Sequence, residues 1–124
     1  MIQAHEFVAE ARQMLQAARS SEIRRRTAAS RAYYGCYHLF LAYAKARGYA
    51  FSKDDRKGMH EHLLQALPDY LEDDDDLIQM FKDLETLKTL RRDCDYRLAE
   101  NIPYESVAFA VERAEHIVAL MTEA

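Results

Sequence analysis

The sequence predicts an all-α protein, an antiparallel up-and-down bundle of four to five helices. Apolar residues recur at intervals of three and four along almost the whole chain, which is the spacing of an amphipathic helix. Glycine occurs three times and proline twice in 124 residues, so the residues that mark turns are scarce. The short joins favour antiparallel packing of sequential helices within a single domain over residues 1–124.

The first two helices are expected over about residues 4–18 and 22–47. The first carries one apolar stripe, formed by Phe7, Val8, Ala11, Met14, Leu15 and Ala18. Ser20 and Ser21 separate the two helices, and a serine oxygen there can accept a hydrogen bond from an N–H group of the next first turn. Gly48 offers the second helix a left-handed stop.

The rest of the chain predicts two or three further helices. The segment 52–55 resembles a capping box and opens a helix that reaches about residue 67. An acidic run over 72–76 precedes a long helix expected over about 75–99, and carboxylates at a helix start are stabilised by the helix dipole. Pro103 suits a first helical position and begins a last helix that runs to about residue 122.

Composition and charge narrow the classes of function. The formal net charge is −4, so any phosphate site must be a local cluster of cations. The longest apolar run, over residues 39–44, is too short to cross a bilayer, and the first residues do not resemble a secretory signal. The acidic run lacks the spacing of a calcium loop, and no cofactor motif is found. We therefore expect a cytoplasmic protein that has reduced thiols and needs no metal or cofactor.

The helix expected over 22–47 is apolar around most of its circumference, which is typical of a central or interfacial helix. Arg31, Tyr34, Gly35 and His38 fall at helical steps and are expected to share one face. They are either satisfied polar groups at an interface or the wall of a polar pocket. Gly35 costs about 1 kcal/mol relative to alanine within a helix, so something is expected to pack closely against it. Three arginines at 24–26 form either a solvated face or a phosphate patch.

The helix expected over 75–99 places a cation in its apolar stripe. Arg91 occupies a position at which the spacing of Leu84 and Leu87 predicts an apolar residue, and Asp95 lies four residues on as its partner. Arg92 and Tyr96 form a second pair on one face. These residues either make ordinary helix salt bridges or join Arg31 and His38 in one site.

Two segments resemble the HEPN (higher eukaryotes and prokaryotes nucleotide-binding) domain family. Residues 30–38 read S-R-A-Y-Y-G-C-Y-H and resemble the family's S-R-x-Y-Y-x-x-x-H stretch. Residues 90–96 read L-R-R-D-C-D-Y and resemble its R-x-x-x-D-Y variant. The resemblance implies a HEPN-like helical bundle that dimerises through its long helices.

The nuclease branch of this family cuts RNA without metal, using an Arg followed after four to six residues by His. Arg92 and Asp93 match the start of that motif, whereas Arg97, Leu98 and Ala99 occupy the positions of the His. Small members of the family are encoded beside a minimal nucleotidyltransferase, often as toxin–antitoxin pairs. In those pairs a tyrosine near the Arg motif is a target of modification, a position to which Tyr96 corresponds by neighbourhood.

The resulting hypothesis is a homodimeric, HEPN-like component of a prokaryotic two-protein module of toxin–antitoxin or defence type. It would bind nucleotide or RNA phosphate and a minimal nucleotidyltransferase partner. The candidate ligand-binding residues are Arg31, Tyr34, His38, Arg91, Arg92, Asp95 and Tyr96. One alternative is a metal-independent endoribonuclease toxin whose Arg/His motif lacks the usual His. The other is a non-catalytic structural interaction module.

Overall fold

The computed structural model describes residues 2–17, 21–46, 48 and 75–123, and these ranges contain four helices and no strand. The helices are α1 (Ala4–Ala17), α2 (Glu22–Ala46), α4 (Asp75–Tyr96) and α5 (Tyr104–Glu123). The all-α prediction is therefore confirmed for this part of the chain, and the helix predicted over about 52–67 lies outside the described residues.

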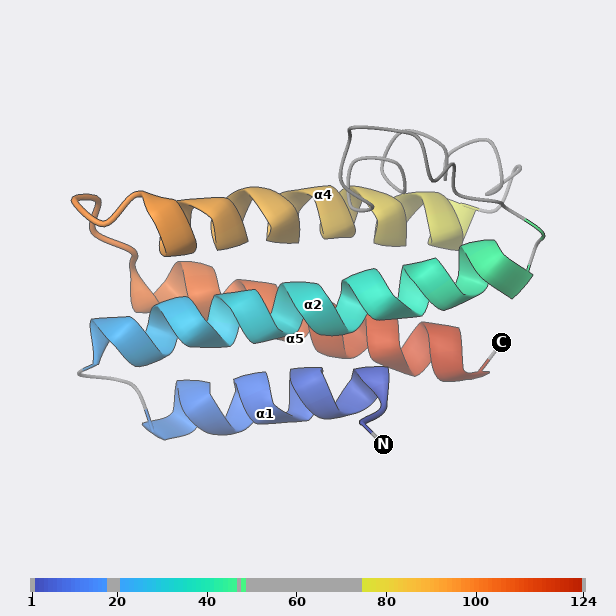
Figure 1. Cartoon of the computed structure of the whole chain (residues 1–124), viewed down its shortest axis with the longest axis horizontal. Helices are drawn as coiled ribbons and strands as arrows, with labels where there is room; N and C mark the ends of the chain where they lie inside the picture. Colours follow the sequence, from blue (N-terminus) through green and yellow to red (C-terminus); the bar gives the residue numbers. More distant parts are fainter. Residues whose placement is uncertain (1, 18–20, 47, 49–74, 124) are drawn as a thin grey trace.

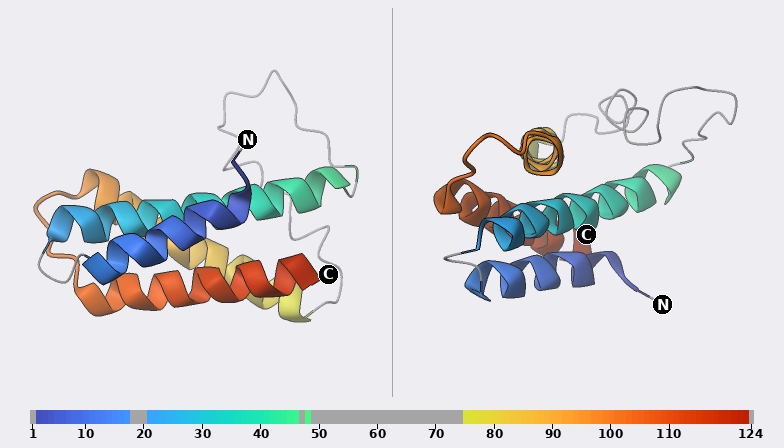
Figure 2. Two further views of the ribbon diagram at one scale, coloured as in Figure 1. Left: turned by 90° about the horizontal axis from the view of Figure 1, so that it is seen from below. Right: turned by 60° about the vertical axis from the view of Figure 1, so that its left-hand side comes forward.

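The described helices run alternately up and down, as Figure 1 shows. Helix α2 packs against α1, α4 and α5, and α5 also contacts α1 and α4. The views in Figures 1 and 2 place α1 and α4 on opposite sides of the layer formed by α2 and α5. None of the described helices combines the length and the apolar character that crossing a membrane requires.

The core is built mainly around α2. Its buried side chains point toward three different neighbours, which explains why the helix is apolar around most of its circumference. Tyr33 and Phe40 are fully buried, and the Phe40 ring meets that of Phe81 on α4 edge to face at 6.5 Å between centroids. The other helices contribute amphipathic stripes to the same core. Their fully buried members include Leu15, Leu84, Leu87, Val107, Val111 and Ile117.

Helix α1 approaches α2 closely at Gly35. A β-carbon built at this position would lie 2.6 Å from Cγ2 of Val8 and 3.0 Å from the carbonyl oxygen of Ala4. Val8 is itself only 2% exposed and β-branched, so its methyl group has little room to move. The predicted close packing at Gly35 is therefore confirmed, and the neighbour is α1.

Both ends of α2 have the local signals that the sequence predicts. At the start, the Ser21 hydroxyl oxygen accepts a hydrogen bond of 3.4 Å from the backbone N–H of Arg24. At the end, Gly48 has a φ of +84°, and its N–H donates to the carbonyl oxygen of Lys45 at 3.1 Å. The positive φ is the conformation for which glycine is suited after a helix.

Helix α4 ends at Tyr96, three residues before the predicted end, and the guanidinium of Arg26 donates to carbonyl oxygens at this end and just beyond it. Arg26 is only 5% exposed, and its nitrogens donate to the carbonyl oxygens of Cys94 at 2.9 Å and Arg97 at 3.2 Å. Leu98 lies beyond the helix end and is 75% exposed. Arg26 therefore belongs neither to a solvated face nor to a phosphate patch.

Gly35→Ala is expected to lower the free energy of unfolding by about 1–2 kcal/mol, even though alanine favours the helix, because the added methyl group collides with α1. Urea denaturation measures this change. Val8→Ala shortens the colliding side chain, so the cost of Gly35→Ala should be smaller in a Val8→Ala background than in the wild type. An equal cost in both backgrounds would contradict the packing at this contact.

Candidate functional site

The structure divides the sequence-predicted site residues among three places. Tyr34, Arg91 and Asp95 meet at the boundary between α2 and α4. Arg92 and Tyr96 lie on the outward face of α4 and line a hollow there. Arg31 and His38 instead lie beside α1. The residues of α2 that the sequence places on one face therefore serve two different helix neighbours.

The boundary between α2 and α4 holds a small polar network. The Ser30 hydroxyl donates a hydrogen bond of 2.6 Å to Oδ1 of Asp95, and Oδ2 of Asp95 accepts one of 3.5 Å from Arg91. The Arg91 guanidinium lies 5.2 Å from the ring centroid of Tyr33 and 5.6 Å from that of Tyr34. A cation over an aromatic face is attracted by the ring's quadrupole, and this contact complements the ion pair with Asp95. The predicted salt bridge between Arg91 and Asp95 is confirmed.

This network also explains how Arg91 fits an apolar stripe. Its side chain is 11% exposed, and its Nε atom is buried without a hydrogen bond among the described residues. The tyrosine rings cover it on the side of α2. The guanidinium of Arg91 thus mainly contacts residues that join α4 to α2. Arg91 is therefore less available to an external anion than Arg92 is. Ser30, which sequence reasoning did not single out, is part of the same network.

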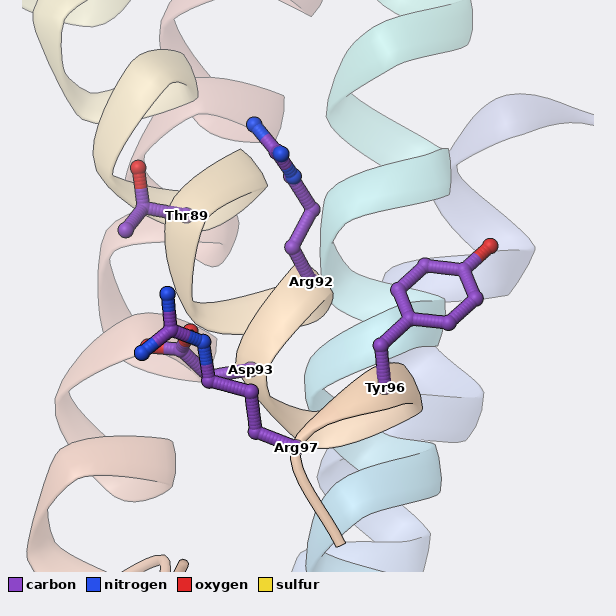
Figure 3. A pocket seen from close by; sticks show the side chains of 5 residues that line it. All are labelled: Thr89, Arg92, Asp93, Tyr96 and Arg97. Atoms are coloured by element: carbon purple, nitrogen blue, oxygen red, sulfur yellow. The ribbon is translucent and has the colours of Figure 1, made fainter.

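The hollow on α4 has a volume of about 380 Å³ and is shown in Figure 3. It is lined by Thr89, Arg92, Asp93, Tyr96 and Arg97. In Figure 3 the side chains of Asp93 and Arg97 lie together on one side of α4, and Tyr96 projects on the other. The sequence-based ligand-binding candidates include Arg92 and Tyr96 but not the other three residues, although Asp93 and Arg97 stand at the i and i+4 spacing of a helix ion pair.

The two arginines of this hollow differ in their partners. Arg97 pairs with Asp93 at 3.2 Å and with Glu100 at 3.2 Å. Arg92 is exposed and makes no hydrogen bond or ion pair with any residue in the described ranges. Tyr96 is 74% exposed and likewise lacks a partner within those ranges. A guanidinium can bind a phosphate through two parallel N–H donors, and an exposed tyrosine ring can stack on a base.

Arg31 and His38 have different surroundings. The His38 ring stacks on Phe7 of α1 with 5.6 Å between centroids. Arg31 is exposed and borders a hollow of about 360 Å³ between α1 and α2 that also contains Glu6 and Glu10. Neither residue lines the α4 hollow. Two carboxylates beside Arg31 make that second hollow a poor place for an anion.

The described ranges contain no group of three or more His, Cys, Asp or Glu side chains arranged to hold a metal ion. The two cysteines are buried and form no disulfide. Burial raises the pKa of the Cys94 thiol to about 11, and it also raises the pKa of Cys36 above its ordinary value. A thiol must lose its proton to act as a nucleophile, so the raised pKa values make both cysteines poor nucleophiles at neutral pH.

Comparison with protein-family models, with curated proteins and with solved structures found no match for the chain. The resemblance to the HEPN family is carried by the segments 30–38 and 90–96 and stays a prediction.

The cysteines give a direct test of this packing. At pH 8, only about one Cys94 thiol in a thousand is ionised when its pKa is about 11. Alkylation by iodoacetamide, followed by mass spectrometry, should therefore be far slower in the native chain than in urea for both cysteines. The rate for Cys94 should rise as the pH approaches 11. Labelling of native Cys94 at the unfolded rate would contradict its burial beneath Arg26.

Proposed function

We propose that the chain is a HEPN-like component of a prokaryotic two-protein module of toxin–antitoxin or defence type, and that it binds nucleotide or RNA phosphate on α4. The observation that carries this proposal is the α4 hollow, in which Arg92 and Tyr96 are exposed. An uncommitted guanidinium beside an exposed aromatic ring suits a ligand that has both a phosphate and a base.

The charges around the hollow assign different roles to its cations. Arg92 can bind a phosphate without breaking an existing ion pair with a described residue. Arg97 can contribute only when its contacts with Asp93 and Glu100 rearrange. A hydrogen bond to a charged group contributes about 1.5–3 kcal/mol to the binding free energy. With only one guanidinium and one stacked ring, each chain is expected to bind its ligand weakly.

The contact between the two motif segments supports the HEPN-like part of the proposal. Ser30, the first residue of segment 30–38, donates to Asp95 of segment 90–96 at 2.6 Å. Arg91 of the later segment lies over Tyr33 and Tyr34 of the earlier one. Residues that the resemblance selects from distant parts of the sequence are thus neighbours in space. The homodimer and the minimal nucleotidyltransferase partner are proposed on the same resemblance.

No residue that the structure describes favours the endoribonuclease alternative. A metal-independent ribonuclease needs a group that transfers protons near neutral pH, for which histidine is best suited. His38 lies against Phe7, and the α4 hollow is lined by none of the histidines that the structure describes. The proposal is accordingly limited to binding.

Arg92→Ala is expected to weaken binding of a short single-stranded RNA or of adenosine 5′-monophosphate about tenfold at low salt, because it removes a charge-assisted contact to phosphate. Isothermal titration calorimetry measures this loss. Lys82→Ala is the matched control, since Lys82 is an exposed cation on the same helix outside the hollow. Tyr96→Phe should bind as the wild type does, whereas Tyr96→Ala should bind more weakly.

Repeating the titration at several salt concentrations tests the same phosphate contact independently. Loss of one phosphate contact should reduce the slope of log affinity against log salt by about 0.7 for a single strand. Equal affinities in Arg92→Ala and Lys82→Ala, or no binding by the wild type, would reject phosphate binding at this hollow.

A further inference from the structure

Phe109 is exposed in the second turn of α5, on the side opposite to the helix's buried stripe. It lies two residues from both Val107 and Val111, which are fully buried, so it points away from the core. Its exposed fraction is 56%. Glu105 and Glu112 are four residues before it and three after it, which places both carboxylates on the same helix face. An aromatic ring thus stands between two acids on this surface.

The same residues line a surface hollow of about 630 Å³. Tyr104 and Ala108 complete it beside Glu105, Phe109 and Glu112. Both completing residues are half-buried and pack against the core, so the floor of the hollow is fixed by the bundle. We call these five residues the Phe109 surface. It shares no residue with the hollow on α4.

Arg12 of α1 interacts electrostatically with Glu112, but its ion pair is formed with a carboxylate outside the Phe109 surface. Arg12 of α1 donates through Nε and through its terminal nitrogen to both carboxylate oxygens of Glu115, a two-pronged pair that occupies much of its donor capacity. That hydrogen bonding is the main factor that raises the pKa of Arg12; burial partly offsets it, and the negative charges of Glu115 and Glu112 add to the increase. Glu105 and Glu112 form no ion pair with any residue that the structure describes.

We propose that the Phe109 surface docks a basic segment of a protein partner, with an arginine or lysine side chain lying over the Phe109 ring between Glu105 and Glu112. A cation is attracted by the face of the ring and by both carboxylates. An apolar partner would desolvate the two acids without compensation, and an anionic partner would be repelled by them. The inference does not depend on phosphate binding by α4.

The test uses the full chain and two synthetic peptides. One is a blocked peptide of sequence Leu-Arg-Ala-Ala-Arg-Leu, and the other carries neutral citrulline in place of both arginines. In amide-detected NMR titrations at low salt, the arginine peptide should bind and shift signals mainly over residues 104–112. The citrulline peptide should bind much more weakly, because it retains the shape but not the charge.

Substitutions separate the contributions of the ring and the acids. Phe109→Leu keeps an apolar side chain without the ring and should weaken binding of the arginine peptide about threefold. The pair Glu105→Gln and Glu112→Gln should weaken it about fivefold. The control pair Glu10→Gln and Glu85→Gln removes the same charge from exposed positions elsewhere and should leave the affinity unchanged.

Three results would overturn the proposal. The first is equal binding of the two peptides, and the second is shifts spread over the acidic surface of all four described helices. The third is equal affinity in the Glu105/Glu112 and Glu10/Glu85 variants. Arg92→Ala should bind the peptide as the wild type does, so failure of phosphate binding and failure of peptide docking are distinguishable.

Discussion

The buried guanidinium of Arg26 fixes where α4 ends and how it lies on α2. The last carbonyls of a helix have no partner within the helix and carry partial negative charge. Arg26 supplies donors to the carbonyl oxygens of Asp93, Cys94, Arg97, Leu98 and Glu100, and its side chain also pairs with Glu22 at 3.1 Å. The buried guanidinium needs hydrogen-bond acceptors and the helix end needs hydrogen-bond donors, so this contact satisfies the hydrogen-bonding groups of both. The connection to α5 is held in place by the same contact.

The position of α4 decides which of its arginines faces a ligand. One helical step of about 100° separates Arg91 from Arg92. With the end of α4 fixed by Arg26, that step turns Arg91 onto the tyrosines of α2 and Arg92 outward into the α4 hollow. Arg26 and Arg91 are thus structural, whereas Arg92 is available to bind. The proposed phosphate site follows from the register of the helix rather than from the number of cations in the sequence.

Much of this fold follows from local patterns. Helical spacing, Ser21 and Gly48 predict the described helices closely, and Gly35 signals a close neighbour correctly. The spacing of Arg91 and Asp95 likewise predicts their ion pair. Contacts between distant residues are beyond such patterns. Helical spacing shows which residues share a side of α2 but not which neighbouring helix each residue contacts. It therefore could not show that Arg31 and His38 lie beside α1 while Tyr34 contacts Arg91 of α4. The hydrogen bonds from Arg26 to the carbonyl oxygens at the end of α4 join residues about seventy positions apart in the sequence. No local sequence pattern predicts such a contact.

The role of Arg26 is tested most directly by hydrogen exchange and urea denaturation of Arg26→Met, with Arg24→Met as the exposed control. Methionine keeps much of the side chain's length but provides no donor for the carbonyls of α4. We predict that Arg26→Met lowers the free energy of unfolding by about 3 kcal/mol, because buried acceptors lose their partner. Amides over residues 92–97 should also exchange much faster, while Arg24→Met behaves as the wild type. Wild-type stability and unchanged exchange in Arg26→Met would contradict the claim that this guanidinium holds the end of α4.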